Sequence, residues 1–250
     1  MDKKKRALVT GGAKRIGAEI VKYLAENGFA VTVHVWQSQA EAEELIKNLP
    51  SAEAHCVSVC DFSDPQARKE WLKSIGTFDL VVNNASAYRL NAPGSKEPTE
   101  IRQRYWQINY LAAVEIATHA AAKNSQALVI NMLDSDILNN RGGVKDPVEP
   151  PIGEDYYLYS RIMLGHMTAA MAAEYAPEVR INGIAPGPVL PPVNCATPGM
   201  TQVLKDVPMK RPAAIGEILA AIGFFRENAS LTGVILPVDG GKHLNDFSAE

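Results

Sequence analysis

Hydrophobic and polar positions alternate with two different periods along the chain, and the change of period predicts a parallel β-sheet with helical connections. Seven short apolar runs predict strands, at residues 7–9, 30–35, 56–59, 80–82, 127–132, 179–184 and 234–238. Segments with helical periodicity lie between them, at residues 17–27, 40–49, 101–122 and 157–175, with a further helix that extends through residue 71. Strands that alternate with helices in this order are typical of a doubly wound α/β fold. We therefore expect one domain over residues 1–250.

Two segments interrupt this alternation. Residues 139–155 contain three prolines and three glycines, which predicts a loop. Residues 186–209 are also rich in proline, and we expect a loop with a short helix near Thr201. Loops this long inside a compact domain usually have a function. Both are therefore expected near the active site.

Composition excludes several classes of function. The net charge is −3 and no long block of like charge occurs, so we expect no nucleic-acid partner. No apolar run reaches about 18 residues, and the charged start is followed by a turn, so neither a membrane span nor a signal peptide is expected. Cys56, Cys60 and Cys195 lack the spacing of metal ligands. These features predict a cytoplasmic protein without a bound metal.

A glycine-rich segment follows the first predicted strand and precedes the first predicted helix. It runs from Thr10 to Gly17 as TGGAKRIG. Glycines let the backbone approach a pyrophosphate, and the following helix N-terminus offers free N–H groups and a positive dipole end. This arrangement predicts a Rossmann dinucleotide site. The cofactor contacts expected in this loop are Gly11, Lys14, Arg15, Ile16 and Gly17.

The end of the second strand indicates which dinucleotide is bound. The strand is followed by Trp36, Gln37 and Ser38, with no acid that would bind a ribose 2′-hydroxyl. Ser38 can donate a hydrogen bond to a 2′-phosphate, and Arg15 can hold one through two hydrogen bonds. We therefore expect Trp36, Gln37 and Ser38 to contact NADPH. The alternative is that Lys14 and Arg15 are only solvated loop charges.

The order of further motifs resembles the short-chain dehydrogenase/reductase family from Ala7 to about His243. The segments that carry the resemblance are the glycine loop, Asp61-Phe62, Asn83-Asn84-Ala85-Ser86, Tyr157-x-x-x-Arg161, Pro186-Gly187 and Val238-Asp239-Gly240-Gly241. The resemblance implies a homotetramer or homodimer. It also implies cofactor contacts at Asp61, Phe62, Asn84, Ala85, Ser86, Tyr157, Arg161, Pro186 and Gly187.

Three positions are similar to the pteridine reductase and dihydromonapterin reductase branch of that family. Arg15 replaces the middle glycine of the loop, Ser86 ends the asparagine motif, and Asp134 closes the fifth strand where most of the family has serine. A carboxyl group beside the catalytic tyrosine suits protonation of a pterin ring nitrogen better than polarisation of a ketone. Alternatively, Asp134 is only a loop-entry cap, and Ser135 can act as a substitute hydroxyl.

The resemblance implies that Tyr157 gives a proton to the substrate. The family has lysine four residues later, on the same helix face, where this chain has Arg161. At about 4 Å and an effective dielectric constant of about 20, two opposite unit charges attract each other by about 4 kcal/mol. We therefore expect Arg161 to lower the pKa of Tyr157. Arginine cannot release a proton at working pH, so any relay through an ammonium group is lost. Asn109 matches the asparagine that supports the family's lysine through water.

The sequence thus favours an NADPH-dependent reductase that transfers hydride to a pterin-like ring or a carbonyl group. Ser86, Tyr88 and residues 186–209 are expected to line its substrate site. Arg161 favours a different class of function, a cofactor-binding protein with little or no activity that acts as a sensor or subunit partner. A carbonyl reductase acting on another substrate is a third alternative.

Overall fold

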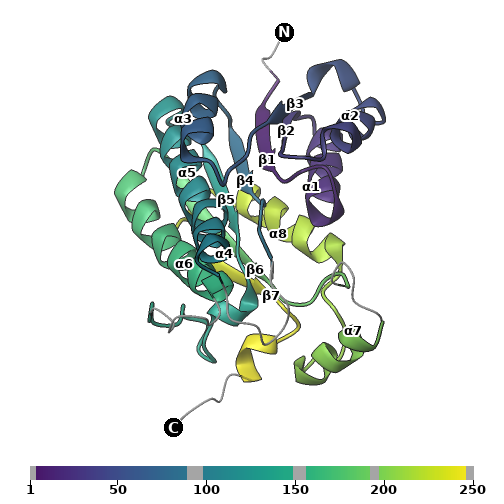
Figure 1. The fold of residues 1–250 in the computed structure, drawn as a ribbon, viewed down its shortest axis with the longest axis vertical. Helices are drawn as coiled ribbons and strands as arrows, with labels where there is room; N and C mark the ends of the chain where they lie inside the picture. The colour runs from purple at the N-terminus through teal and green to yellow at the C-terminus, as the bar shows by residue number, and fades with distance from the viewer. Residues whose placement is uncertain (1–3, 89–97, 149–155, 192–196, 246–250) are drawn as a thin grey trace.

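All strand pairs in the central sheet are parallel, as the alternation of strands and helices predicts. The computed structural model describes residues 4–88, 98–148, 156–191 and 197–245 (Figure 1). Within them, seven strands form one sheet in the order β3-β2-β1-β4-β5-β6-β7. This confirms the predicted doubly wound Rossmann fold. The strands are β1 (Arg6–Thr10), β2 (Ala30–Val35), β3 (Cys56–Val59), β4 (Leu80–Asn83), β5 (Leu128–Met132), β6 (Arg180–Pro186) and β7 (Ile235–Val238).

Helices cover both faces of the sheet because the buried strands are apolar on both sides. In β1, Ala7 and Val9 face one layer and Leu8 faces the other. One face carries α1 (Arg15–Glu26), α2 (Gln39–Lys47) and α8 (Ile215–Glu227). The opposite face carries α3 (Pro65–Ser74), α4 (Thr99–Tyr105), α5 (Ala112–Lys123) and α6 (Tyr156–Tyr175).

The helix expected at residues 101–122 is not a uniform α-helix. Between α4 and α5 the chain forms a π-helical segment, η2 (Trp106–Leu111). Such segments are rare and are frequent at functional sites. Asn109 lies in η2 and is completely buried. The hydrophobic period of the sequence does not predict this change of winding, because it depends on how α4 and α5 pack on α6.

α8 lies where no helix is predicted from the sequence, although its buried residues follow a helical period. Ile218, Ala221, Ile222 and Phe225 are all buried. Gly223 within α8 lowers the helix propensity, and a Cβ atom there would lie 2.8 Å from the hydroxyl of Tyr23. The short helix expected near Thr201 is present as α7 (Thr197–Val203).

Only part of each predicted loop is described. In the first loop, Asn139 accepts hydrogen bonds from the backbone N–H groups of Arg141 and Gly143, which closes a turn. Residues 149–155 and 192–196, and with them Cys195, lie outside the described residues. In the described part of the chain, no helix is long and apolar enough to span a bilayer. The same residues contain no group of three His, Cys, Asp or Glu side chains that could hold a metal.

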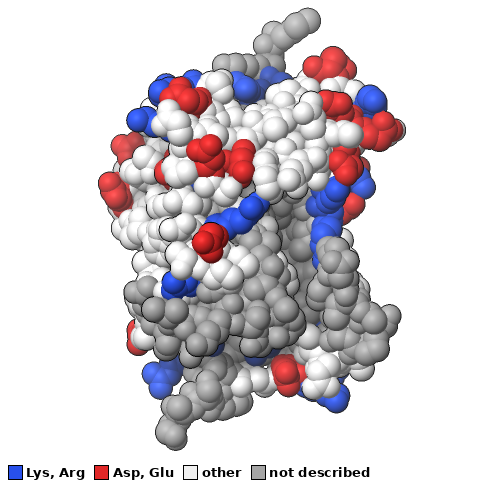
Figure 2. All heavy atoms as spheres, in the orientation of Figure 1, with Lys and Arg blue, Asp and Glu red and all other residues white. Residues whose placement is uncertain are grey.

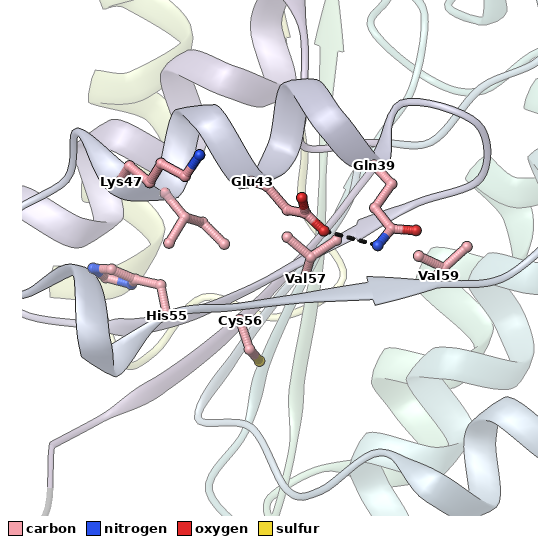
Figure 3. A pocket seen from close by; sticks show the side chains of 8 residues that line it. Gln39, Glu43, Lys47, His55, Cys56, Val57 and Val59 are labelled. Carbon is pink, nitrogen blue, oxygen red and sulfur yellow. Dashed lines mark hydrogen bonds between the residues drawn. The ribbon is translucent and has the colours of Figure 1, made fainter.

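A pocket of about 430 Å³ lies beside the edge strand β3 (Figure 3). It is formed between α2 and β3, and none of its lining residues belongs to the predicted site. The pocket is therefore separate from the candidate active site. Its lining residues are Gln39, Glu43, Ile46, Lys47, His55, Cys56, Val57 and Val59.

Candidate active site

The predicted catalytic residues meet at the carboxyl edge of the sheet, where ligands bind in open α/β folds. Asp134 follows β5, and Tyr157 lies in the first turn of α6. The Tyr157 hydroxyl donates a hydrogen bond to Oδ2 of Asp134 over 2.8 Å. The two residues are therefore together, although the loop between them is longer than the family pattern.

Arg161 lies one turn beyond Tyr157 and is only 3% exposed. Its Nη1 donates to the carbonyl oxygen of Met132 over 3.3 Å, and its guanidinium carbon lies 5.7 Å from the centre of the Tyr157 ring. Within the described residues, Nε of Arg161 is buried and has no hydrogen-bond partner. A buried donor without a partner is costly, so this group is suited to an acceptor from a bound ligand.

The acid–base balance of the site differs from the sequence expectation. Burial raises the pKa of Tyr157 far above its usual value, the charge of Asp134 raises it further, and Arg161 lowers it. Burial also raises the pKa of Asp134, and the neighbouring Asp136 carboxylate adds to that effect. Arg161 thus lowers the pKa of Tyr157 as expected, but the net shift is upward because burial and the charge of Asp134 outweigh it. The site favours a neutral tyrosine.

Asn109 anchors the backbone after β4. Its amide accepts from the N–H of Ala87 over 2.8 Å and donates to the carbonyl oxygen of Ala87 over 2.9 Å. It also donates to Ser160 Oγ over 3.3 Å. Both amide hydrogens are thus directed to Ala87 and Ser160, and a water-mediated link from Asn109 to residue 161 stays a prediction.

The glycine loop is held against β4 by the asparagine motif. The Asn84 side chain donates to the carbonyl oxygens of Thr10 and Gly11 over 2.9 and 3.1 Å. A Cβ atom on Gly17 would lie 2.3 Å from the Gly11 oxygen, so only glycine permits this approach. Arg15 has a φ of 55°, in the left-handed region that glycine favours. The arginine therefore holds a backbone conformation that glycine adopts at lower cost.

Three contacts surround the predicted 2′-phosphate region. Lys14 forms an exposed ion pair with Glu41 over 2.7 Å. Nη2 of Arg15 donates to the Pro191 carbonyl oxygen over 2.9 Å. Trp36 is 41% exposed, and the guanidinium of Arg104 lies 4.6 Å from its ring centre. Figure 2 shows basic side chains on both sides of the hollow in this face of the molecule.

The turn after β3 is anchored in the hydrophobic core. Asp61 accepts two hydrogen bonds from Ser63, and the Phe62 ring stacks on His34 with ring centres 3.8 Å apart. Phe62 is only 3% exposed, and its carbonyl oxygen accepts a hydrogen bond from Arg68. The predicted cofactor contact at Phe62 cannot come from its side chain, because that side chain belongs to the core.

Sequence and structure comparisons identify the family. A family model described as short chain dehydrogenase matches residues 5–200. The chain belongs to the short-chain dehydrogenase/reductase family. L-xylulose reductase of Bos taurus is 30% identical over 95% of this chain and 96% of that protein. Carbonyl reductase (NADPH) 2 of Sus scrofa is 28% identical over 94% and 95% of the two chains.

Solved structures with the same fold include an NADP complex. FolM alternative dihydrofolate reductase 1 from Brucella suis, in complex with NADP, has a TM-score of 0.82 and 29% sequence identity. The match covers 96% of this chain and 95% of that one. A short-chain dehydrogenase from Serratia marcescens has a TM-score of 0.80 and 25% identity over 96% and 98% of the two chains.

A nicotinamide dinucleotide, which the short-chain dehydrogenase family uses, fits the residues present. Gly11 and Gly17 let the loop between β1 and α1 turn tightly and pack closely against the chain after β4, and Arg161 has a spare buried donor. No acid follows β2 at Trp36, Gln37 or Ser38. All of the predicted cofactor contacts stay predictions, including those at Ile16, Ala85, Ser86 and Pro186. Gly187 packs against the chain after β7, since a Cβ atom on it would lie 2.7 Å from the Cα atom of Asp239.

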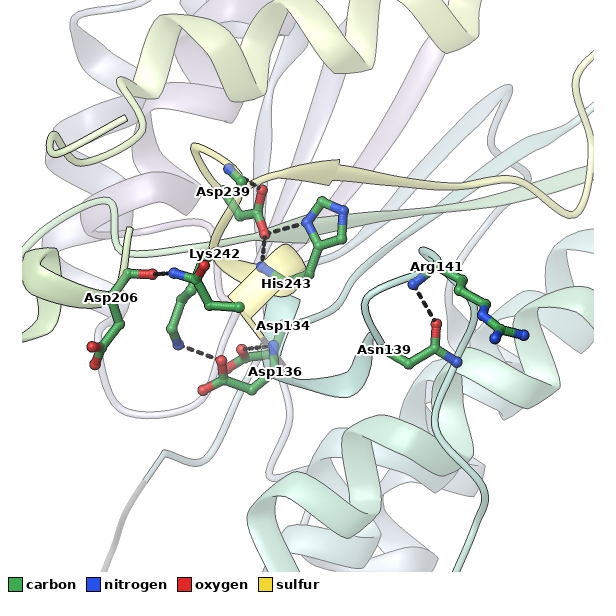
Figure 4. A network of polar contacts seen from close by, with 10 residues as sticks. Asp134, Asp136, Asn139, Arg141, Asp206, Asp239, Lys242 and His243 are labelled. Carbon is green, nitrogen blue, oxygen red and sulfur yellow. Dashed lines mark hydrogen bonds and ion pairs between the residues drawn. The ribbon is translucent and has the colours of Figure 1, made fainter. Parts of the chain in front are cut away.

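The structure adds a polar network to the short-chain dehydrogenase motif (Figure 4). Asp136 donates its backbone N–H to Oδ1 of Asp134, and its carboxylate forms an ion pair with Lys242. Sequence reasoning missed Asp136, Lys242 and Arg104, because each acts through a contact between residues distant in sequence. A lysine shortly after the C-terminal Gly-Gly pair was the only visible signal for Lys242.

Proposed function

We propose that this protein is an NADPH-dependent reductase of a dihydropterin or a similar flat, polar ring, with Tyr157 as the proton donor. The observation that carries the proposal is the 2.8 Å hydrogen bond between Tyr157 and Asp134. A carboxyl group at this position accepts hydrogen bonds from ring N–H and amino groups, which a pterin offers and a simple ketone does not.

Tyr157, Asp134 and Arg161 have separate roles in the reduction of a C=N bond. When bound, the nicotinamide dinucleotide would supply the hydride that is added to the ring carbon. Tyr157 is neutral before the transfer because burial and Asp134 raise its pKa, and the charge of Arg161 opposes that rise and so helps the hydroxyl proton move to the ring nitrogen. Asp134, whose own pKa is raised, can return a proton to the phenolate oxygen. Arg161 offers its spare N–H to the nicotinamide ribose and its charge to the transient phenolate.

The surroundings of Tyr157 support a flat substrate. The Tyr88 ring stands edge-on to the Tyr157 ring, with centres 4.9 Å apart, and Tyr88 is 48% exposed. An exposed aromatic face beside the proton donor can stack on a planar ring. FolM alternative dihydrofolate reductase 1 from Brucella suis, named above, also points to a ring of this kind.

NADPH rather than NADH is proposed on the charges around β2. The guanidinium of Arg104 lies over the Trp36 ring, Lys14 pairs with Glu41 of α2, and Arg15 follows Lys14 in the glycine loop. Ser38 precedes α2 without making a side-chain capping bond. A 2′-phosphate matches this set of donors. The proposal extends to a homo-oligomer, and an elution volume close to the monomer mass in light-scattering chromatography would contradict that part.

The central experiment is NADPH oxidation with dihydropterins and with ketones. Wild type is expected to reduce the dihydropterin faster, and Tyr157→Phe should lower turnover at least about 100-fold. Asp134→Ser should lose pterin turnover while ketone turnover is kept or increased. Unchanged pterin turnover in Tyr157→Phe would overturn the proposal.

Two other functions have specific support. The L-xylulose and NADPH carbonyl reductases among the relatives favour reduction of a small carbonyl compound, and the ketone arm of the experiment tests this. Arg161 favours a cofactor-binding protein with little activity. NADPH binding without oxidation across the whole substrate panel would support that function. A gain of turnover in Arg161→Lys would instead show a latent enzyme.

A further inference from the structure

The carboxyl group that accepts from Tyr157 is connected to a charge pair at the C-terminal end of the fold. Asp134 precedes a short 3₁₀ turn, η3 (Ser135–Ile137), and its Oδ1 accepts from the backbone N–H of Asp136 over 2.9 Å. The carboxylate of Asp136 pairs with the ammonium of Lys242, which lies on another 3₁₀ turn, η5 (Lys242–Asn245). Residues 108 positions apart in sequence are thereby joined in one network at the site (Figure 4).

The conformation of the chain after β7 positions Lys242 next to Asp136. Asp239 is 4% exposed and accepts from the backbone N–H groups of Gly241 and His243. Its Oδ2 also lies 2.6 Å from Nδ1 of His243. Gly240 and Gly241 have φ values of 66° and 84°, which side chains rarely adopt. Lys242 is therefore the first residue of a fixed turn, and its side chain is only 22% exposed.

The position of the Lys242 ammonium matters because this chain has arginine, not lysine, at residue 161. Arg161 keeps its charge at every working pH, so it cannot adjust the site to protonation. Asp136 and Lys242 are a carboxylate and an ammonium, and both act on Asp134. The groups that act on Asp134 are Tyr157 from α6, Asp136 from η3 and Lys242 from η5, and Arg161 acts on Tyr157.

We propose that Asp136 and Lys242 are positioning residues that act as a pair to set the charge of Asp134, and through it the proton exchange of Tyr157. This role rests on the proposed function of Tyr157 and Asp134 as the proton-transfer pair. Asp136 orients Asp134 through its N–H group and opposes its charge, and Lys242 offsets the opposing charge.

Asp136 and Lys242 shift the pKa of Asp134 in opposite directions. Burial is the largest influence that raises the pKa of Asp134, Asp136 raises it further, and Lys242 lowers it. Loss of Lys242 leaves Asp136 uncompensated, so the midpoint of Asp134 should move to higher pH. Loss of the Asp136 charge leaves Lys242 uncompensated, so the midpoint should move to lower pH. A purely structural role would not produce opposite shifts.

The test is a titration of Asp134 by NMR with ¹³C-labelled aspartate carboxyl groups, in the protein with NADP⁺ bound. The signal is assigned with Asp134→Asn. Lys242→Met should raise the Asp134 midpoint and Asp136→Asn should lower it, each by roughly 0.5–1 pH unit, because partly exposed charges are screened. Lys242→Arg should behave as wild type. Lys73→Met, which breaks an exposed ion pair on α3, is the control and should cause no shift.

The same signs are expected in the pH profile of turnover. If the Asp134 midpoint shifts in the same direction in Lys242→Met and Asp136→Asn, or shifts in neither, the proposal is overturned. If Lys242→Met does not fold, Asp136→Asn alone must still lower the midpoint, and an unchanged value overturns the proposal. The titration needs no substrate. Absent pterin turnover with opposite shifts would therefore reject the proposed function only, and normal turnover without shifts would reject this inference only.

Discussion

Single residues beside the glycine loop show how burial and backbone geometry decide properties that residue type alone leaves open. His34 is 3% exposed and stacked on Phe62. Its Nδ1 accepts from the Gly11 N–H over 3.4 Å, so Nε2 carries the proton donated to the Cys60 carbonyl oxygen. A neutral histidine thus links the cofactor loop to the turn after β3. Arg15 beside it adopts a conformation that is costly for any residue except glycine.

The protein should lose stability in mild acid because of His34. Burial lowers the pKa of His34 to about 4, while the unfolded chain keeps a value near 6.5. Below pH 6.5 the unfolded state binds a proton that the folded state does not, so the free energy of unfolding falls as pH falls towards 4. Between pH 7 and pH 5 the loss should be about 2 kcal/mol. Urea unfolding at both values measures it, and His34→Gln should remove this part of the slope.

Arg15→Gly should separate cofactor selectivity from stability. The substitution removes a group expected at the 2′-phosphate, so NADPH affinity should fall about 10-fold or more while NADH affinity is unchanged. Because residue 15 has a positive φ, the free energy of unfolding should change by less than about 1 kcal/mol. Ser51→Gly, also at a positive φ but outside the site, is the control for stability. Fluorescence titration with both cofactors measures the affinities, and equal losses for NADPH and NADH would contradict the assignment.

Helices contribute to the site through their first turns, and here local charges compete. α2 begins directly after Ser38, so its N-terminus favours an anion. Its first turn also contains Glu41, which pairs with Lys14 from the loop before α1 and thereby has a lowered pKa. Lys14 must therefore exchange Glu41 for a phosphate if it is to contact NADPH.

Glu41→Gln should strengthen NADPH binding. The change frees Lys14 and removes a negative charge next to the 2′-phosphate region, so affinity should rise about two- to five-fold, as expected for an exposed pair. Glu44→Gln on the same helix breaks a comparable exposed pair with Lys47 and is the matched control. The gain should disappear at high salt. Weaker NADPH binding in Glu41→Gln would place the phosphate elsewhere.

Element positions were predictable where the period was clear and the motif contiguous. The seven strands and the Tyr157 register followed from local patterns, since each motif lies next to a strand or helix end. The π-helical turn around Asn109 could not be predicted, because it depends on how α4 and α5 pack on α6. The net upward shift of the Tyr157 pKa could not be predicted for a similar reason, since burial and the approach of Asp134 are tertiary effects. Arg104 and Lys242 act only through residues distant in sequence.

At the scale of the whole molecule, the cofactor should tie together segments from most of the chain. The predicted contacts extend from Gly11 to Gly187 and come from the ends of β1, β2, β3, β4 and β6. A ligand that contacts so many strand ends binds the folded state only, because the unfolded chain does not bring these segments together. Its binding free energy then adds to the stability of the fold.

NADPH should therefore raise the melting temperature more than NADH does. At a concentration 100 times its dissociation constant, a ligand adds about 2.7 kcal/mol. For a chain of this size that corresponds to roughly 5–10 °C. Scanning fluorimetry with each cofactor at the same concentration measures the difference, and Arg15→Gly should reduce the shift for NADPH alone. Equal shifts with both cofactors would argue against selectivity for the phosphate.

The pairing of Lys242 with Asp136 has a practical consequence for how the protein is handled. An affinity tag or fluorescent label attached next to η5 lies within a few positions of Lys242, whose ammonium pairs with Asp136. A label before β1 instead joins the opposite, amino edge of the sheet. Assays of this chain should therefore compare both placements, since an acidic C-terminal epitope would compete for the Lys242 ammonium and imitate a loss-of-function variant.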